Sequence, residues 1–327
     1  MSVRATEPCW YLVDMESGWG RAQEHQSLGL QEINDHLGGH GILATNASLL
    51  DEGRANTNYR LRLTDGREAV LRIIQRDTAS IPLEVELAER YGSRFLIPRV
   101  LAKDLRQSFL VTEWIAGESL QALAAEGRNA EVLSAGRDAG RILADISSVT
   151  YLRAGFLEGS LGVSQPWESA YDGLFDYLCQ CAASAVATGW AGKTLCDRCV
   201  LAWREREPDL RSAMQSPRLV HGDFKLQNLV VDEGRLRGVL DWEFAHSGTP
   251  LMSIGQMVRH EGSLPAGFRA SFLDGLSKGP WDIPDGVWDL ARLVDLCSLM
   301  DFLSRDSTGA EMAADVTRLI RATLGGT

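Results

Sequence analysis

Long hydrophobic runs are absent from this 327-residue chain. It contains no stretch of about 18 consecutive apolar residues, so we expect no transmembrane helix. The first twenty residues, MSVRATEPCWYLVDMESGWG, also lack the continuous apolar segment of a cleaved signal peptide. We therefore interpret the protein as cytoplasmic and expect no association with membranes.

Positive charge is also scarce. The chain has 33 Lys and Arg residues against 44 Asp and Glu residues, and its formal net charge is −11. This balance argues against a general nucleic-acid-binding protein, because such a protein needs a basic face. The deficit is larger in residues 117–327, with 20 basic and 28 acidic side chains, than in residues 1–116, with 13 and 16. An acidic surface can attract a cationic small molecule, but it can equally be an ordinary solvated surface.

Cysteine is limited to six residues. Cys179 and Cys181, and then Cys196 and Cys199, are spaced like the two halves of a zinc site. The surrounding sequence TLCDRCVLAW instead predicts an amphipathic helix, in which cysteine is a common buried residue. We interpret these cysteines as core residues, and we expect no disulfide framework in a cytosolic protein.

The first part of the chain has the patterns of a small β-rich lobe. NYRLRLTDGREAVLRII (58–74) predicts a hairpin, because an alternating apolar run is followed by the turn residues Asp65 and Gly66 and by a second β-prone run. SFLVTEWI (108–115) predicts another strand, and SLGLQEINDHLG (27–38) predicts a short helix that Ser27 would cap.

Beyond residue 120 the spacing of apolar residues becomes helical. The predicted helices are residues 132–147, 167–185, 193–207 and 287–305. We therefore predict a bilobal α+β fold for a chain of this length. Its parts are an N-terminal extension with a helix (1–44), a β-rich lobe (45–116) and a larger helical lobe (117–327).

A short β segment, HGDFKLQNLVVDEGRLRGVLDWE (221–243), interrupts the helical half. Asp and Gly are common turn residues, so a plain hairpin is one interpretation. The spacing of Asp223 and Asn228 gives the pattern H-x-D-x-x-x-x-N, in which a kinase Asp orients the acceptor hydroxyl and the Asn holds a metal ion. Asp241, after the hairpin, is suited to chelate the Mg²⁺ that bridges nucleotide phosphates.

HGDFKLQN together with LDWE resembles the aminoglycoside phosphotransferase and choline kinase-like family of small-molecule kinases. The resemblance implies a protein kinase-like fold, with Asp223 as the catalytic base and Asn228 and Asp241 as metal ligands. Gly222 occupies the position of an Arg in protein kinases, which points away from protein substrates. Lys225 falls where many kinases carry a lysine near the transferred phosphate, although a solvated surface lysine is an equal alternative.

The same resemblance implies a nucleotide site in the β-rich lobe. LLDEGRANTNYRL (49–61) fits a phosphate-covering loop, with Gly53, Asn56 and Asn58 as candidate contacts. The next strand contains none of the chain's four lysines, so Arg72 takes the place of the usual phosphate-binding cation.

An acid on the following helix would hold that arginine, and a connector would bind the purine. The segment IPLEVELAERYG (81–92) offers Glu84 for the first role, with Glu86 as the alternative. FLVTEWIAGESL (109–120) resembles the hinge that pairs with the purine, through the backbone of Glu113 and Ile115.

Two features concern the helical lobe. Ser253 stands where the family usually has an Asp that supports the catalytic loop, and a serine forms weaker hydrogen bonds than a carboxylate. Asp295 lies on a partly apolar helix face, so it is a candidate contact for an ammonium or hydroxyl group of the acceptor; Glu261 and Asp301 are weaker candidates.

These observations predict a kinase that moves the γ-phosphoryl group of ATP to a hydroxyl of a small molecule, with Mg²⁺ as cofactor and GTP as an alternative nucleotide. An aminoglycoside or related antibiotic fits the acidic helical lobe, and amino alcohols and sugars are alternative acceptors. A catalytically weak nucleotide-binding module is the alternative from another class, because of Ser253. The oligomeric state is left open.

Overall fold

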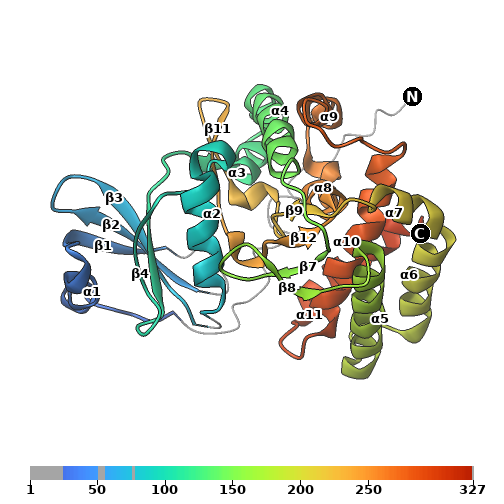
Figure 1. Ribbon diagram of the computed structural model, residues 1–327, viewed down its shortest axis with the longest axis horizontal. Helices are drawn as coiled ribbons and strands as arrows, with labels where there is room; N and C mark the ends of the chain where they lie inside the picture. The colour runs from blue at the N-terminus through green and yellow to red at the C-terminus, as the bar shows by residue number, and fades with distance from the viewer. Residues whose placement is uncertain (1–24, 51–55, 76–77, 326–327) are drawn as a thin grey trace, which may run out of the picture.

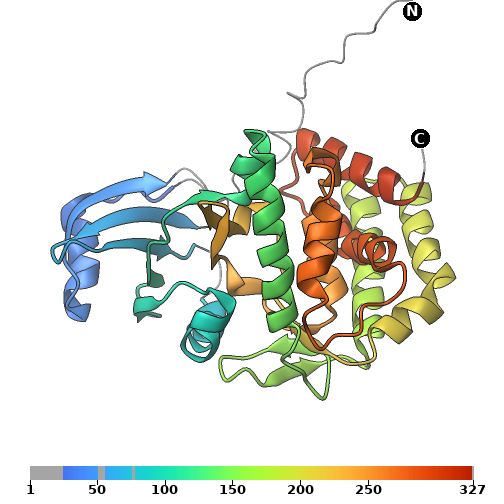
Figure 2. The same cartoon turned by 90° about the horizontal axis from the view of Figure 1, so that it is seen from above.

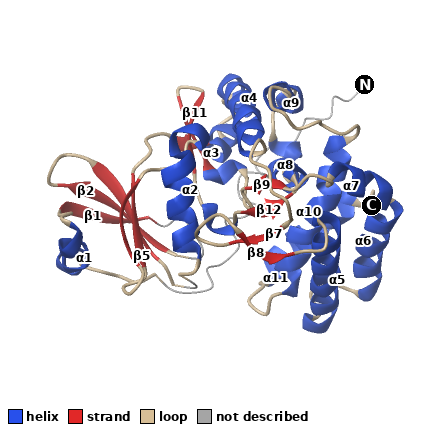
Figure 3. Ribbon diagram, viewed as in Figure 1, coloured by secondary structure: helices blue, strands red, loops and turns tan. Residues whose placement is uncertain are grey.

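The computed structural model describes residues 25–50, 56–75 and 78–325, which form a smaller sheet-containing lobe and a larger helical lobe (Figures 1 and 3). The smaller lobe has a five-stranded antiparallel sheet with the strand order β1-β2-β3-β5-β4. Its strands are β1 (Ala44–Leu50), β2 (Thr57–Leu63), β3 (Glu68–Ile73), β4 (Val100–Asp104) and β5 (Phe109–Glu113). The architecture confirms the predicted bilobal α+β fold.

The β2–β3 hairpin follows directly from the sequence pattern. Tyr59, Leu61 and Leu63 are buried on one face of β2, while the arginines between them are more exposed. Gly66 has a φ of 85°, a value that glycine adopts without strain, and it closes the turn after Asp65. The prediction of a hairpin at this position is confirmed.

Helix α1 (Leu30–Leu37) packs on this sheet, because Ile33 and Leu37 belong to the same hydrophobic core as Leu61. Its N-cap is Gly29, whose backbone N–H donates to the Glu32 carboxylate at 2.7 Å. The prediction of a helix is confirmed, but the predicted cap at Ser27 is wrong. The cap is set by the carboxylate three residues inside the helix.

Helix α2 (Ser80–Phe95) lies between the sheet and the helical lobe (Figure 1). Phe95 at its end stacks on Trp242 with ring centroids 6.0 Å apart. The Val239 N–H also donates to the carbonyl of Leu96 at 2.9 Å. These contacts join the smaller lobe to the segment that carries the predicted catalytic residues.

The larger lobe is built mainly from helices around one hydrophobic core. Its helices are α3 (Leu120–Ala125), α4 (Asn129–Ile146), α5 (Ala170–Thr188), α6 (Lys193–Glu205), α7 (Glu207–Ala213), α8 (Pro250–Val258), α9 (Phe268–Leu276), α10 (Val287–Ser304) and α11 (Ala310–Thr323). Seen from above, α4 stands between the smaller lobe and α9 (Figure 2). The four predicted helices correspond to α4, α5, α6 and α10. None of the described helices is long and apolar enough to cross a membrane.

Short strands form the side of the helical lobe that faces the sheet lobe (Figure 1). They are β6 (Glu118–Ser119), β7 (Gly155–Leu157), β8 (Val163–Pro166), β9 (Arg218–Val220), β10 (Leu229–Asp232), β11 (Arg235–Val239) and β12 (His246–Gly248). Strands β10 and β11 make the hairpin predicted between the two aspartates, and β6 pairs with β10. Strand β12 pairs with both β7 and β9. The loops that leave β9 and β11 therefore lie at the junction of the lobes.

Candidate active site

The loop after β9 brings Asp223 and Asn228 together. Asn228 donates from Nδ2 to the Asp223 carboxylate and to the Asp223 backbone carbonyl, both at 2.8 Å. The ammonium of Lys225 lies 3.1 Å from the same carboxylate, and both side chains are about a quarter exposed. The carboxylate is therefore fixed by an amide and by a cation, while part of its surface stays accessible.

His221 holds the start of this loop from inside the protein. Its ring is fully buried, its Nε2 lies 2.9 Å from the carbonyl of Leu240, and its Nδ1 lies 3.1 Å from the backbone nitrogen of Asp223. Because a carbonyl only accepts and a backbone N–H only donates, the ring is neutral, with the proton on Nε2. Burial lowers the pKa of His221 to about 4, against a weaker opposing effect of Asp223.

Asp241 follows β11 and has a left-handed backbone, with φ 61° and ψ 65°. Such a conformation is strained for a residue with a side chain and is often found at functional sites. The indole Nε1 of Trp242 donates to the carbonyl of Val239 at 2.9 Å, and the ring packs 4.5 Å from His221. The tryptophan thereby fixes the turn that presents Asp241, a role that the sequence pattern did not reveal.

Arg72 on β3 reaches the same place from the smaller lobe. It is ion-paired with Glu84 of α2, and its Nη1 lies 3.6 Å from Oδ1 of Asp241. Burial alone would lower the pKa of Arg72, but Glu84 and Asp241 together raise it, so the guanidinium stays charged. Glu84, and not the alternative Glu86, is the partner, since Glu86 pairs with Arg90.

One donor of this arginine is left without a partner. The Nε of Arg72 and the Oδ1 of Asn58 are both buried and have no hydrogen-bond partner within the described part of the chain. The two residues are directly opposite each other on β3 and β2. Buried polar atoms of this kind are rare and call for a ligand or water. A phosphate oxygen fits the arginine, because the guanidinium is a donor that suits phosphate geometry.

The remaining predicted nucleotide contacts lie before β2, at the end of β5 and in the connector after it. Asn56 is buried immediately before β2, and its Oδ1 accepts from the Gln75 N–H at 3.4 Å. Glu113 ends β5, where its backbone N–H donates to the carbonyl of Arg99. Ile115 follows in the connector, close against Gly238 of β11. Gly53 lies outside the described residues.

Residues 46–292 match the model of the phosphotransferase enzyme family. The chain belongs to the phosphotransferase enzyme family. The match covers both lobes and all four polar residues that meet at their junction: Arg72, Asp223, Asn228 and Asp241. No curated protein sequence matches the chain.

Solved structures share the fold of this phosphotransferase at low sequence identity. An apo macrolide 2'-phosphotransferase from Brachybacterium faecium is 16% identical with a TM-score of 0.65, over 84% of this chain and 91% of that one. A thermostable aminoglycoside phosphotransferase APH(4)-Ia mutant, bound to ADP and hygromycin B, is 18% identical with a TM-score of 0.66, over 90% and 97%. A Thermobifida fusca protein assigned as a fructosamine-3-kinase is 17% identical with a TM-score of 0.64, over 91% and 100%.

Glu243 is a third acid at the junction of this phosphotransferase, which the sequence analysis did not single out. Burial and the nearby Asp241 raise the pKa of Glu243 to about 7, against the opposing effect of Arg72. The sequence LDWE could have indicated this residue, because it places Glu243 two positions after Asp241, on the other side of the buried Trp242.

The donor set fits Mg²⁺ held jointly with phosphates. The side chain of Asp241 is 54% exposed, so a cation can reach its carboxylate from solvent. The negative charge of Asp223 acts on Asp241 across the site, and a divalent cation would relieve this repulsion. The Nδ2 group of Asn228 is engaged, so its Oδ1 remains for a cation. The described residues contain no group of three His, Cys, Asp or Glu that could hold a metal ion.

The predicted acceptor contacts Asp295, Glu261 and Asp301 each form an ion pair with an arginine. Asp295 makes two hydrogen bonds to Arg259, at 2.6 and 2.9 Å, and its side chain is only 4% exposed. It is a core ion-pair residue, so the interpretation of Asp295 as an acceptor contact does not fit the structure. Glu261 pairs with Arg292, and Asp301 pairs with Arg305. All three acids are therefore paired with arginines of this chain.

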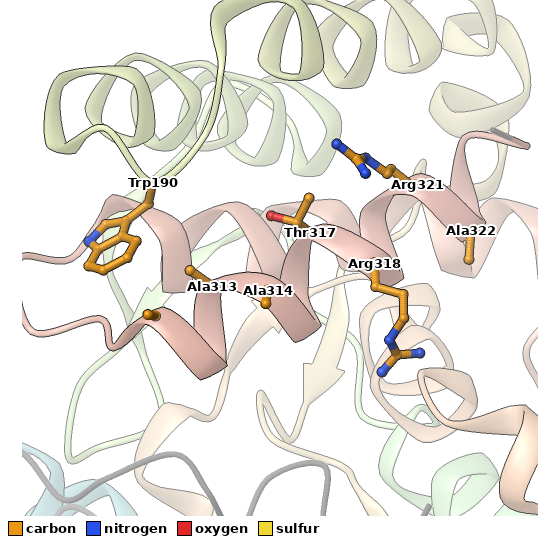
Figure 4. Close-up of a pocket in the computed structure, with 8 residues that line it drawn as sticks. Trp190, Ala313, Ala314, Thr317, Arg318, Arg321 and Ala322 are labelled. Carbon is orange, nitrogen blue, oxygen red and sulfur yellow. The ribbon is translucent and has the colours of Figure 1, made fainter. Parts of the chain in front are cut away.

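A surface cavity of about 680 Å³ lies far along the chain from these groups, beside α11 (Figure 4). Trp190 and the α11 residues Thr317, Arg318 and Arg321 line it together with four alanines. It contains none of the residues at the lobe junction. The cavity is therefore separate from the candidate active site of the phosphotransferase.

Proposed function

We propose that this protein transfers the γ-phosphoryl group of ATP to a hydroxyl group of a small molecule. The observation that carries the proposal is the meeting of Asp223, Asn228, Asp241 and Arg72 at one place between the lobes. Phosphoryl transfer needs little covalent chemistry from the protein. Positioning of the two reactants and stabilisation of the phosphate charge supply most of the catalysis.

Each residue has a role that its surroundings support. The accessible carboxylate of Asp223 accepts a hydrogen bond from the acceptor hydroxyl and orients it toward the phosphorus atom. Asn228 and Lys225 hold that carboxylate in place. Arg72, kept charged by Glu84, binds phosphate oxygens through its Nε–H, which has no partner among the described residues.

The metal would be held by Asp241 and by the Oδ1 of Asn228. When bound, Mg²⁺ neutralises the charge of the phosphate groups. The left-handed turn at Asp241 directs the carboxylate toward Arg72, so the protein's cation and the metal ligand face the same volume. The backbone of Glu113 and Ile115 would pair with the purine of ATP, or of GTP as the alternative.

The acceptor belongs to the class of small hydroxyl compounds. An aminoglycoside or related antibiotic, an amino alcohol and a sugar are the candidates. The arginine partners of Asp295 and Glu261 weaken the case for a cationic acceptor that the acidic helical lobe had provided. A screen should therefore include neutral compounds on equal terms.

The test is ADP formation in the presence of Mg²⁺-ATP and a panel of aminoglycosides, macrolides, amino alcohols and sugars, with mass spectrometry of the phosphorylated acceptor. The Asp223→Asn variant should lower kcat by roughly 10²–10⁴-fold while nucleotide binding is retained. Asp232→Asn is the matched control, because Asp232 lies on the hairpin and contacts Arg237 at its exposed surface. No acceptor-dependent ADP formation above the Asp223→Asn background would refute the proposal. Retained nucleotide binding in that case would favour a regulatory binding module.

A further inference from the structure

One side chain of α8, Gln256, binds the backbone of the loop that carries Asp223. The backbone N–H of Phe224 donates to Oε1 of Gln256 at 2.9 Å, and Nε2 of Gln256 donates to the carbonyl of Gly222 at 2.6 Å. Gln256 is only 5% exposed. Its amide therefore spans the backbone immediately before and after Asp223, the residue that would orient the acceptor.

The two contacts need a group that both accepts and donates, as the Gln256 amide does. The Phe224 N–H can only donate and the Gly222 carbonyl can only accept, so the partner must offer one acceptor and one donor in a fixed geometry. An ionised carboxylate would place an oxygen against the Gly222 carbonyl. A fully satisfied buried network of this kind makes the local structure rigid.

Ser253 does not take this role. It is fully buried one turn earlier on α8, and its Oγ has no hydrogen-bond partner among the described residues. The family resemblance places a loop-supporting Asp at this position. Residues three apart lie on the same side of a helix, so Gln256 approaches the loop from the side on which that Asp would stand.

Helix α8 is itself held rigidly. Gly255 lets it lie against α10, since a Cβ atom at this position would come within 2.3 Å of the carbonyl oxygen of Ala291. One turn beyond Gln256, Arg259 forms its buried ion pair with Asp295 of α10. The amide of Gln256 is thus carried on a support that cannot easily shift.

We propose that Gln256 is the positioning residue that fixes the backbone on both sides of Asp223, in place of a carboxylate at residue 253. The role in catalysis rests on the proposed function, because it acts through the carboxylate that orients the acceptor. A displacement of about 1 Å of such a group can cost about 100-fold in rate. The contribution is made through geometry, and Gln256 itself touches no substrate.

The test compares Gln256→Leu, Gln256→Glu and the control Ser253→Ala with the wild type. Gln256→Leu should lower kcat about 10–100-fold while KM for ATP changes less than about threefold, because the loop moves but the nucleotide contacts do not. Gln256→Glu should also lower kcat, because the acceptor for Phe224 remains but the donor to Gly222 is lost. Ser253→Ala, which deletes a buried hydroxyl that no described residue contacts by a hydrogen bond, should keep the wild-type kcat.

Amide hydrogen exchange gives an independent readout. The Phe224 amide should exchange faster in Gln256→Leu, while the core amides of α10 keep their protection. Unchanged kcat and unchanged Phe224 exchange in a folded Gln256→Leu protein would overturn the inference, as would a loss of kcat in Ser253→Ala equal to that in Gln256→Leu. If the wild type itself transfers no phosphoryl group, the proposed function fails, and exchange at Phe224 alone decides whether Gln256 holds the loop.

Discussion

The buried ring of His221 should make the stability of this protein fall as the pH is lowered from 7 to 5. In the unfolded chain the pKa is 6.5, and in the folded protein burial lowers it to about 4. Between these values the unfolded state binds more protons than the folded state, so acid favours unfolding. The loss begins as the pH falls through about 6.5 and is complete below about 4.

The size of the effect follows from the two pKa values. A shift of one unit corresponds to about 1.36 kcal/mol, so the full window accounts for roughly 3 kcal/mol of unfolding free energy. Between pH 7 and pH 5 the same two values give a loss of roughly 2 kcal/mol. The raised pKa of Glu243, about 7, makes the folded protein take up a proton over the same interval and opposes this loss, so His221 is isolated by comparing a His221 variant with the wild type.

The assay is urea unfolding at pH 7, 6 and 5, followed by the fluorescence of the chain's nine tryptophans, of which Trp242 lies beside the His221 ring. His221→Gln keeps a donor for Leu240 but has no group that titrates here. The free energy of unfolding of this variant can differ from that of the wild type at any one pH. The quantity compared is therefore the change in that free energy between pH 7 and pH 5. We expect the variant to lose roughly 2 kcal/mol less than the wild type.

A matched control is His36→Gln, which changes a partly exposed histidine of α1 and leaves the His221 ring in place, so the loss of stability that His221 causes should persist in it. His246 is also deeply buried with a lowered pKa, so it contributes equally to both proteins in the comparison. An identical loss of stability in His221→Gln and wild type would show that the ring of His221 is not the group that acid protonates.

Two further predictions concern the metal ligand and the buried ion pair. Mg²⁺-ATP at about 100 times its dissociation constant should stabilise the wild type by about 2.7 kcal/mol, visible as a shift in thermal midpoint that needs Mg²⁺. Asp241→Ala should abolish the shift and Asp232→Ala should retain it; an equal shift in Asp241→Ala would remove Asp241 from the nucleotide site. Asp295→Ala should destabilise the protein by about 3–5 kcal/mol, since it leaves Arg259 buried without its carboxylate. A stable Asp295→Ala protein with a raised KM for the acceptor would instead restore Asp295 as an acceptor contact.

Local patterns of the sequence determined much of the fold and part of the site. Apolar periodicity predicted the β2–β3 hairpin and helices α4, α5, α6 and α10, because side-chain spacing reflects the geometry of each element. The spacing of Asp223 and Asn228 likewise predicted their association. Asn228 follows Asp223 by five positions, so a single turn of the loop brings the amide to the carboxylate.

Only the tertiary structure decided which distant groups become partners. Asp295 was correctly recognised as a charge on an apolar face, but its partner Arg259 lies 36 residues earlier, at the C-cap of α8. Arg72 meets Asp241 only because the two lobes pack together. The sequence showed that residue 253 had lost the expected carboxylate, and the packing of α8 brought Gln256 to the loop instead. A buried charge or backbone group must find a partner, and which residue supplies it depends on how the elements pack in three dimensions.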